Sequence, residues 1–212
     1  MLSEVGTATV SDALDRLGLP GSALGIAPLA PGQRMAGPAF TVRYVPVGAT
    51  RGTVGDYIDD CEPGDVVVLD NDGRLDCTVW GDILTAVADA RGLAGTAING
   101  VCRDVAAPLS LGYPIYSRGR FMRTGKDRVE VAEVGGIVTL GDVRVAVGDL
   151  VIGDDDGVVV VPADRAEQVA TTAIHIAETE DRIVEAVRDG MTLGEARKIH
   201  GYHALQRPEE GS

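Results

Sequence analysis

Alternating strand and helix patterns between residues 63 and 117 restrict the fold of this chain more than any other feature. Residues 63–70, PGDVVVLD, form a turn followed by an unbroken apolar run, which is typical of a strand buried on both faces. After a turn at 71–74, the expected elements alternate along the chain: a strand at 77–80, a helix at 81–91, a strand at 95–98, a helix at 104–111 and a strand at 114–117. Strands separated by helices at this spacing are usually parallel, so the sequence predicts an α/β fold around a parallel sheet.

Different patterns lie on either side of this segment. A short helix is expected at 9–17, and the β-branched and aromatic run at 37–47 predicts a strand. From Val129 onward, three hairpin-like segments with Gly-Asp turns predict a second, mainly antiparallel sheet. The three aspartates at 154–156 lack the spacing of a calcium loop and are expected to form a tight turn.

Residues 163–189 predict one long helix. Apolar side chains recur along one side of it at helical spacing, and Gly190 follows. We expect a helix of this length to pack on another subunit. The chain of 212 residues is therefore divided into one domain over 1–190, which includes this helix, and a tail over 191–212 whose last residues, RPEEGS, are expected to fray.

Composition excludes several classes of function. With 19 Lys and Arg against 32 Asp and Glu, the net charge of −13 repels phosphate backbones, so nucleic acid is not an expected direct partner. No signal-peptide pattern is visible, and no run approaches the roughly 18 apolar residues of a membrane helix. The three cysteines form no C-x-x-C pair, which argues against a disulfide framework or a zinc site. These features predict a soluble, cytoplasmic protein.

Trp80-Gly-Asp-Ile-Leu84 is the first of two segments with the chemistry of a binding site. A strand is expected to give way to a helix at Gly81 and Asp82, so the backbone amides of the helix N-terminus should be free. A carboxylate could be held there by four amides, those of Gly81, Asp82, Ile83 and Leu84. We expect Trp80 to lie in the core, with its indole N–H donating to a backbone acceptor.

Asn99-Gly-Val-Cys-Arg-Asp104 is the second segment, and it too follows an expected strand. Carboxyl ends of neighbouring parallel strands meet at one edge of a sheet, so both segments should face one crevice. Arg103 carries a planar, permanently charged fork that suits the carboxylate or carbonyl oxygen of a 2-oxo acid. Asp104 and Asp82 offer hard oxygen ligands without any clustered His or Cys, which favours magnesium or manganese over zinc. A metal and Arg103 together would polarise a 2-oxo group and stabilise an enolate.

Two simpler interpretations remain open at this point. Asp82 could serve only as a helix cap, and Arg103 and Asp104 could form an ordinary surface ion pair. A Schiff-base mechanism has no obvious nucleophile, because the two lysines of the chain, Lys126 and Lys198, lie outside both segments.

The spacing of the two segments matches a known signature. Asp82, twenty intervening residues and then Arg103-Asp104 resemble the D-x20-R-D pattern of the 4-hydroxy-4-methyl-2-oxoglutarate aldolase and RraA-like family. The similarity extends from about Thr7 to Gly190 and includes SDALDRLG, GPAFTV, RGLAGTAINGVCRD and DDDGVVVVP. The resemblance implies a β/β/α sandwich of the swivelling-domain type with a long C-terminal helix. It further implies a homotrimer or homohexamer with sites between subunits.

The resemblance also implies a role for each site residue. Asp104 would bind the divalent metal, magnesium or manganese, directly, and Asp82 would reach it through water. Arg103 would contact the pyruvyl oxygen, while the amides of Gly81 to Leu84 would hold the carboxylate.

Family aldolases also use a glutamate from the C-terminal helix of a neighbouring chain. Glu180 is the best match to it here, with Glu178 next, although no tight motif surrounds either residue. The N-terminus is shorter than in many of the aldolases. The loop FMRTGKDRVEVAEV carries no motif that assigns a particular substrate.

Two classes of function follow from this resemblance. The first is a class II pyruvate aldolase that cleaves 4-hydroxy-2-oxo acids and could also decarboxylate oxaloacetate. The alternative is a non-catalytic regulator that binds a ribonuclease or another protein. The intact Asp82, Arg103 and Asp104 favour the enzyme, as does the long C-terminal helix. A methyltransferase is not expected, because no nucleotide-binding glycine loop is present.

Overall fold

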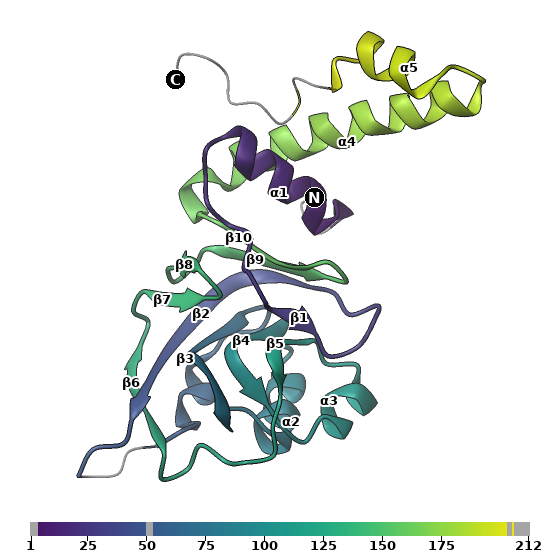
Figure 1. The fold of residues 1–212 in the computed structure, drawn as a ribbon. Coiled ribbons are helices and arrows are strands. Elements are labelled where there is room, and N and C mark those ends of the chain that lie inside the picture. Colours follow the sequence, from purple (N-terminus) through teal and green to yellow (C-terminus); the bar gives the residue numbers. More distant parts are fainter. Residues whose placement is uncertain (1–3, 50–52, 203–204, 206–212) are drawn as a thin grey trace.

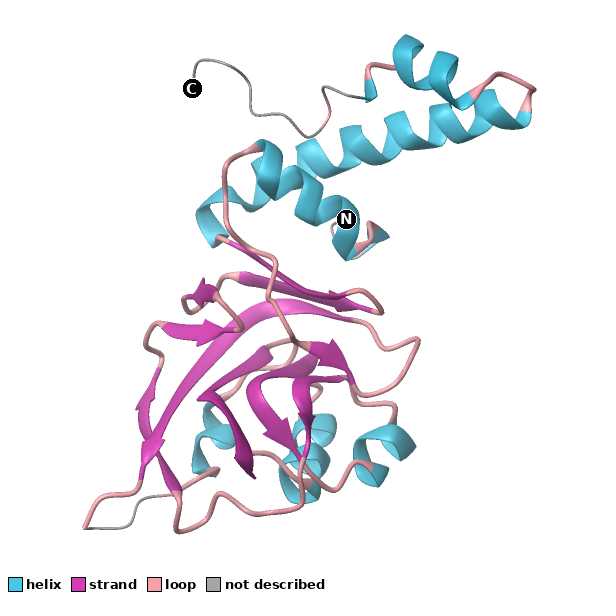
Figure 2. Cartoon of the chain, in the orientation of Figure 1, coloured by secondary structure: helices cyan, strands magenta, loops and turns pink. Residues whose placement is uncertain are grey.

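Strands and helices alternate in the middle of the chain, whereas a run of strands and then the C-terminal helices follow (Figures 1 and 2). The computed structural model describes residues 4–49, 53–202 and 205. The strands, in chain order, are β1 (Ala27–Pro28), β2 (Met35–Pro46), β3 (Val66–Thr78), β4 (Gly95–Cys102), β5 (Ile115–Arg120), β6 (Val129–Val134), β7 (Val138–Leu140), β8 (Val143–Val145), β9 (Leu150–Asp154) and β10 (Gly157–Val161). The helices are α1 (Thr7–Arg16), the 3-10 helix η2 (Asp56–Asp60), α2 (Asp82–Ala90), α3 (Ala106–Leu111), the 3-10 helix η3 (Ala163–Arg165), α4 (Ala166–Arg188) and α5 (Leu193–Ile199).

A parallel unit forms the centre of the sheet, as the sequence predicts. The strand order is β1-β5-β4-β3-β2-β9-β10, with β6 paired to β2 beside this path. β2, β3, β4 and β5 are neighbours and run parallel. α2 follows β3, and α3 follows β4, so both helices begin at the same edge of the sheet.

β3 differs from the expected strand, turn and second strand. It is one strand over Val66–Thr78, but its pairing with β4 shifts twice, because Asp70, Arg74 and Thr78 face the consecutive residues 99, 100 and 101. The expected turn is present inside the strand as an excursion in which Asp72 and Gly73 both have positive φ angles. The predicted strand at 77–80 is wrong in extent, because Trp80 lies beyond the end of β3.

The prediction of a separate antiparallel sheet is also wrong for the last hairpin. β9 and β10 pair antiparallel with each other, and β9 pairs with the first residues of β2, so the hairpin continues the main sheet. β2 pairs with β9 at its start and with β3 further along, and the pairing partner changes just after Gly37 and Pro38. A side chain at Gly37 would collide with the carbonyl oxygen of Gly64, so this crossing requires glycine. The short pair β7 and β8 does form a sheet of its own.

Three apolar layers hold these elements together. Alternate residues of β3 enter different layers: Val67 and Leu69 pack toward α2 and η2, whereas Val66 and Val68 pack toward β7, β8, β9 and β10. A third layer joins the far side of β9 and β10 to α1 and α4. The arrangement is the expected β/β/α sandwich with an additional layer formed by α1 and α4 (Figure 1).

α4 is the long C-terminal helix that the sequence predicts. Its first half packs on α1, while its second half and α5 extend away from the sheet (Figure 1). α5 lies within the segment expected to be a tail and begins with a capping box between Thr192 and Glu195. The RPEEGS segment lies outside the described residues. No helix in the described part of the chain is long and apolar enough to cross a membrane.

The turn between β9 and β10 fixes the start of α1. The Asp154 carboxylate accepts hydrogen bonds from the Thr7 amide (2.8 Å), the Thr7 hydroxyl (2.5 Å) and the Asp156 amide (3.0 Å). Burial by itself would raise the pKa of Asp154, but these hydrogen bonds outweigh it and lower the pKa. Asp154 thus caps a helix that lies 147 residues away in the chain.

Replacing Asp154 with alanine should lower the free energy of unfolding by about 1–2 kcal/mol, the usual cost of losing such a cap. Because the folded-state pKa of Asp154 is lowered, this contribution is complete above the unfolded-state pKa of about 4 and is lost as pH falls through the folded-state pKa. The difference between wild type and variant, measured by urea denaturation, should therefore shrink in acid. Asp156→Ala, an exposed aspartate of the same turn, should change stability by less than about 0.5 kcal/mol. Equal effects of the two substitutions would contradict the capping role.

Candidate functional site

The two segments singled out in the sequence meet at one edge of the sheet. Arg103 and Asp104 follow β4, while Gly81 precedes α2 after the neighbouring strand β3. Arg103 Nε lies 3.1 Å from Asp104 Oδ2, and the Arg103 amide donates to the Trp80 carbonyl at 3.1 Å. The ion pair of the simpler interpretation is therefore present, and its two side chains are 37% and 39% exposed.

Gly81 leaves room for both charged side chains. A Cβ atom at this position would lie 2.7 Å from Asp104 Oδ2 and 3.2 Å from Arg103 Nε. Asp104 itself has a φ angle of 55°, a left-handed backbone conformation that is uncommon outside glycine, asparagine and aspartate. Such strained positions cluster at functional sites, and here the conformation accompanies an aspartate that contacts the N-terminus of α2.

The amides at the start of α2 are not all free, contrary to the prediction. The Asp82 amide donates to Asp104 Oδ2 in a long contact of 3.4 Å, and the Ile83 amide donates to Asp82 Oδ1 at 2.9 Å. Asp82 thus has part of the helix-terminal role that the simpler interpretation gives it. In this structure both amides therefore donate to carboxylate oxygens of the chain itself.

Polar contacts beneath the first turn of α2 connect the two loops. The Trp80 indole Nε1 donates to the Thr85 hydroxyl at 2.9 Å, so its acceptor is a side chain and not the expected backbone carbonyl. The Thr85 hydroxyl in turn donates to the Gly81 carbonyl at 2.9 Å. The Thr78 hydroxyl lies 2.9 Å from the Trp80 carbonyl and 2.8 Å from the Val101 carbonyl, which ties the end of β3 to β4.

A cavity of about 440 Å³ opens in front of these loops. Gly81, Asp82, Ile83, Leu84 and Arg103 line it, together with residues that the sequence analysis missed, whereas Asp104 is not among the residues found to line it. Thr78, Val79 and Val87 adjoin the predicted segment, and the other missed residues come from two distant segments, 53–56 with 58 and 59 of η2, and Thr124–Gly125 after β5. No local motif marks either segment, because each reaches the cavity through tertiary packing.

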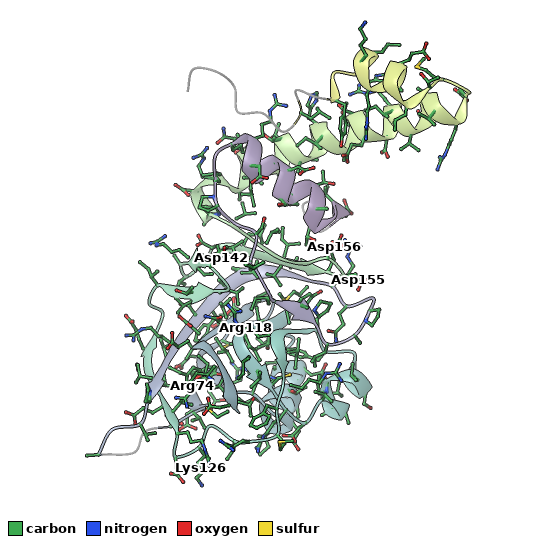
Figure 3. The ribbon with its side chains drawn as sticks, viewed as in Figure 1. Arg74, Arg118, Lys126, Asp142, Asp155 and Asp156 are labelled. Atoms are coloured by element: carbon green, nitrogen blue, oxygen red, sulfur yellow. The ribbon has the colours of Figure 1, made fainter. Side chains whose placement is uncertain are left out.

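Lys126 lies closer to the site than its distance in sequence suggests. It follows Gly125, which lines the cavity, and Thr124 forms an isolated bridge with Thr78. Figure 3 shows Lys126 at the bottom of the molecule, below the β9–β10 turn that carries Asp155 and Asp156.

Glu180 is not brought to Arg103 and Asp104 within one chain. It lies on α4, on the opposite side of the sheet from α2 (Figure 1). The pKa of Glu180 is raised, first because burial desolvates its carboxylate and then because Asp12 and Asp181 repel the charge. Glu178 is exposed on the same helix. Only another copy of the chain could present either glutamate to the cavity.

The donor set of the site fits a hard divalent cation. No group of three or more His, Cys, Asp or Glu side chains that could hold a metal occurs among the described residues. Magnesium, however, commonly keeps several waters and uses only one or two carboxylates. Asp104 and Asp82, adjacent through the contact at the Asp82 amide, satisfy that requirement and lack the sulfur or imidazole ligands typical of zinc.

A second groove, of about 760 Å³, lies beside α1 and the end of β5. Arg118, Asp142 and Asp156, labelled in Figure 3, contribute to its lining. Two of these charged side chains make hydrogen bonds within the fold. Arg118 Nε donates to Asn99 Oδ1 at 2.8 Å, and Asp142 accepts from the Leu24 amide at 3.0 Å. The residues found to line this groove include none of the predicted site residues.

Comparison with known proteins identifies the family of this chain. The RraA-like family, described as Aldolase/RraA, matches residues 7–160. The chain belongs to this family. Aldolase/RraA proteins include both lyases and RraA regulators, so membership gives the fold without deciding between the two functions.

Three relatives illustrate that range. Protein DlpA of Legionella pneumophila is 39% identical over 204 residues, which cover 95% of this chain but only 33% of DlpA, so the chain spans about a third of that relative. A protein of Halalkalibacterium halodurans, with the proposed name 4-hydroxy-4-methyl-2-oxoglutarate aldolase, is 32% identical over 80% of this chain and 78% of its own length. The crystal structure of Streptomyces coelicolor RraAS2, described as an unusual member of the RNase ES inhibitor RraA family, aligns with a TM-score of 0.77 and 29% identity over 85% of this chain and 91% of its own.

Proposed function

We propose that this chain is a divalent-metal-dependent lyase that cleaves a carbon–carbon bond beside a 2-oxo acid and releases pyruvate. The substrate would be a 4-hydroxy-2-oxo acid of the 4-hydroxy-4-methyl-2-oxoglutarate type. The observation that carries this proposal is the convergence of Arg103, Asp104 and the start of α2 within hydrogen-bonding distance, beside a cavity that Arg103 and the start of α2 line.

Each residue of the site has a distinct proposed role. Asp104 would hold the metal directly, and Asp82 would hold it through water. A bound magnesium or manganese ion would supply Lewis-acid polarisation of the 2-oxo group. Arg103 would donate to the 2-oxo oxygen, and the amides of Gly81 to Leu84 would orient the carboxylate.

The reaction requires a place for developing negative charge. When the bond between C3 and C4 breaks, its electron pair moves toward the 2-oxo group, and the 4-hydroxyl becomes a carbonyl as it gives its proton to a base, for which we propose the glutamate of a neighbouring copy. Protonation of the resulting enolate at C3 then gives pyruvate. In this proposal the Arg103 guanidinium would contact the oxygen on which that charge forms, and the contact would strengthen as the bond breaks. Decarboxylation of oxaloacetate leaves the same charge on the same oxygen, and we propose it as a second activity.

A neighbouring copy would complete the site. We propose a homotrimer or homohexamer in which α4 of one chain presents Glu180, or else Glu178, to the cavity of the next. The raised pKa of Glu180 suits a group that exchanges protons nearer neutral pH than an ordinary carboxyl. The exposed apolar residues Val184 and Val187 on the extending half of α4 provide a surface for this contact.

Metal removal tests the proposal most directly. In a coupled assay of pyruvate release over a panel of 4-hydroxy-2-oxo acids and oxaloacetate, activity should vanish with EDTA and return with magnesium or manganese, because the candidate ligands are carboxylates and water. Borohydride added with pyruvate should leave the enzyme active, since no Schiff base forms. Full activity after exhaustive chelation, or trapping of pyruvate on Lys126, would overturn the assignment.

The alternative function is an RraA-type regulator that binds a ribonuclease or another protein partner. The similarity to Streptomyces coelicolor RraAS2 favours this second candidate. The two functions separate in paired assays, one for pyruvate release and one for inhibition of RNA cleavage by an RNase ES-type enzyme. A regulator would inhibit cleavage with Arg103→Lys as well as with the wild-type chain and would release no pyruvate.

A further inference from the structure

We propose that Thr85 is a positioning residue for the carboxylate-binding amides at the start of α2, and that it acts together with the indole of Trp80. The inference rests on the proposed function, because these amides are the groups that would hold the substrate carboxylate. Thr85 is 0% exposed and lies one turn inside α2, so it touches no substrate itself.

Thr85 holds the peptide unit that carries the Asp82 amide. The Gly81 carbonyl accepts hydrogen bonds from both the hydroxyl (2.9 Å) and the amide (3.1 Å) of Thr85. The carbonyl of Gly81 and the N–H of Asp82 belong to one planar peptide group, so fixing the oxygen also fixes the direction of that N–H. The Thr85 hydroxyl therefore sets where the amide points.

Trp80 fixes the Thr85 hydroxyl in turn. The hydroxyl has one hydrogen, which it gives to Gly81, and it accepts the indole N–H of Trp80 on its oxygen. The indole is 1% exposed and stacks on Tyr113 with a centroid distance of 6.4 Å and an interplanar angle of 6°. A rigid ring thus holds the threonine in one rotamer.

Trp80 also connects these contacts to Arg103. The Trp80 carbonyl accepts the Arg103 amide at 3.1 Å, so the backbone of Trp80 contacts one loop of the site while its side chain supports the other. Thr85 is the side chain that transmits this support to Gly81. A valine of similar shape would fill the space but could neither donate to Gly81 nor accept from the indole.

Kinetics distinguish positioning from simple stability. Thr85→Val should raise KM for the 2-oxo acid on the order of 10-fold while kcat stays within about 3-fold, because the carboxylate is bound alike in the ground and transition states. Thr85→Ser keeps the hydroxyl and should restore KM to within about 3-fold of wild type. Thr41→Val is the matched control: Thr41 is also 0% exposed and donates to a backbone carbonyl, that of Gly136, at 2.6 Å, but it lies on β2 away from the cavity. It should leave KM unchanged at a similar cost in stability.

The single tryptophan of the chain provides a second readout that does not need turnover. In a 15N-labelled protein the Trp80 indole gives one N–H signal, which should shift when oxalate, a planar analogue of the pyruvate enolate, is titrated with magnesium. Thr85→Val should bind oxalate roughly 10-fold more weakly by this signal. If this variant did not fold, Trp80→Phe, which removes the indole donor and keeps an aromatic ring in the core, should raise KM in the same way.

The outcomes separate the two proposals. Oxalate binding by wild type without pyruvate release from any substrate would reject the reaction, while the weaker binding by Thr85→Val would still support the positioning role. Equal oxalate affinity or equal KM in Thr85→Val and wild type would overturn that role. Failure of wild type to bind oxalate would overturn both.

Discussion

Replacing Asp104 with alanine or asparagine should eliminate both divalent-metal binding and pyruvate release. Asp104 is the proposed direct ligand, and a neutral side chain there leaves only Asp82, which reaches the metal through water. Loss of the several kcal/mol of charge stabilisation that a bound metal supplies corresponds to roughly a 1000-fold or greater fall in kcat. Isothermal titration with magnesium or manganese and the coupled pyruvate assay measure the two losses separately.

Comparing the two variants separates the loss of a metal ligand from a loss of the fold. Asparagine adopts a φ angle of 55° readily, so Asp104→Asn should keep the fold even if Asp104→Ala is strained there. Asp89→Ala removes an equally negative, exposed side chain from the other end of α2 and should leave metal affinity and turnover near wild type. Tight metal binding by Asp104→Asn would show that the ligand lies elsewhere.

Arg103→Lys should lower kcat by about 30- to 1000-fold, equivalent to roughly 2–4 kcal/mol, while metal affinity stays near wild type. Lysine keeps the positive charge but loses the planar fork, and with it the Nε atom that lies 3.1 Å from Asp104. If Arg103 stabilises charge that forms as the bond breaks, its loss must appear in kcat and not in KM alone.

Arg43→Lys is the matched control for this substitution. Arg43 also pairs with a carboxylate, that of Glu133 at 3.1 Å, at a comparable exposure of 42%, but it lies on β2. Its replacement should leave kcat unchanged. Normal pyruvate release by Arg103→Lys would mean that the guanidinium has no part in the reaction.

Local patterns predicted the parallel unit well and the rest of the sheet less well. The apolar run in residues 63–70 identifies β3, and Leu84, Val87 and Ala88 at helical spacing place α2 within one residue of its observed bounds. The attachment of β9 to the main sheet depends on pairing with β2, more than 110 residues earlier in the chain, and no local pattern reports such a pairing. The turn at 71–74 was predicted, but its place inside a single strand was missed for the same reason, because that strand is defined by its register with β4.

The site, like the fold, was predictable where it depends on the order of elements along the chain. Gly81 and Arg103 come together because each follows one of two adjacent parallel strands, a relation that can be inferred from order along the chain. Thr85 accepts the indole of Trp80 five residues away, yet a threonine in a helix gives no sign of whether its hydroxyl is structural or solvated. The contribution of Glu180 depends on how copies assemble, which the order of elements within one chain does not determine.

The left-handed backbone at Asp104 limits how such a protein could lose its chemistry during evolution. Most residue types would strain that turn, whereas asparagine or glycine would fit it at little cost. A single change to asparagine would thus remove the carboxylate and preserve the scaffold, giving a stable surface free to acquire protein partners.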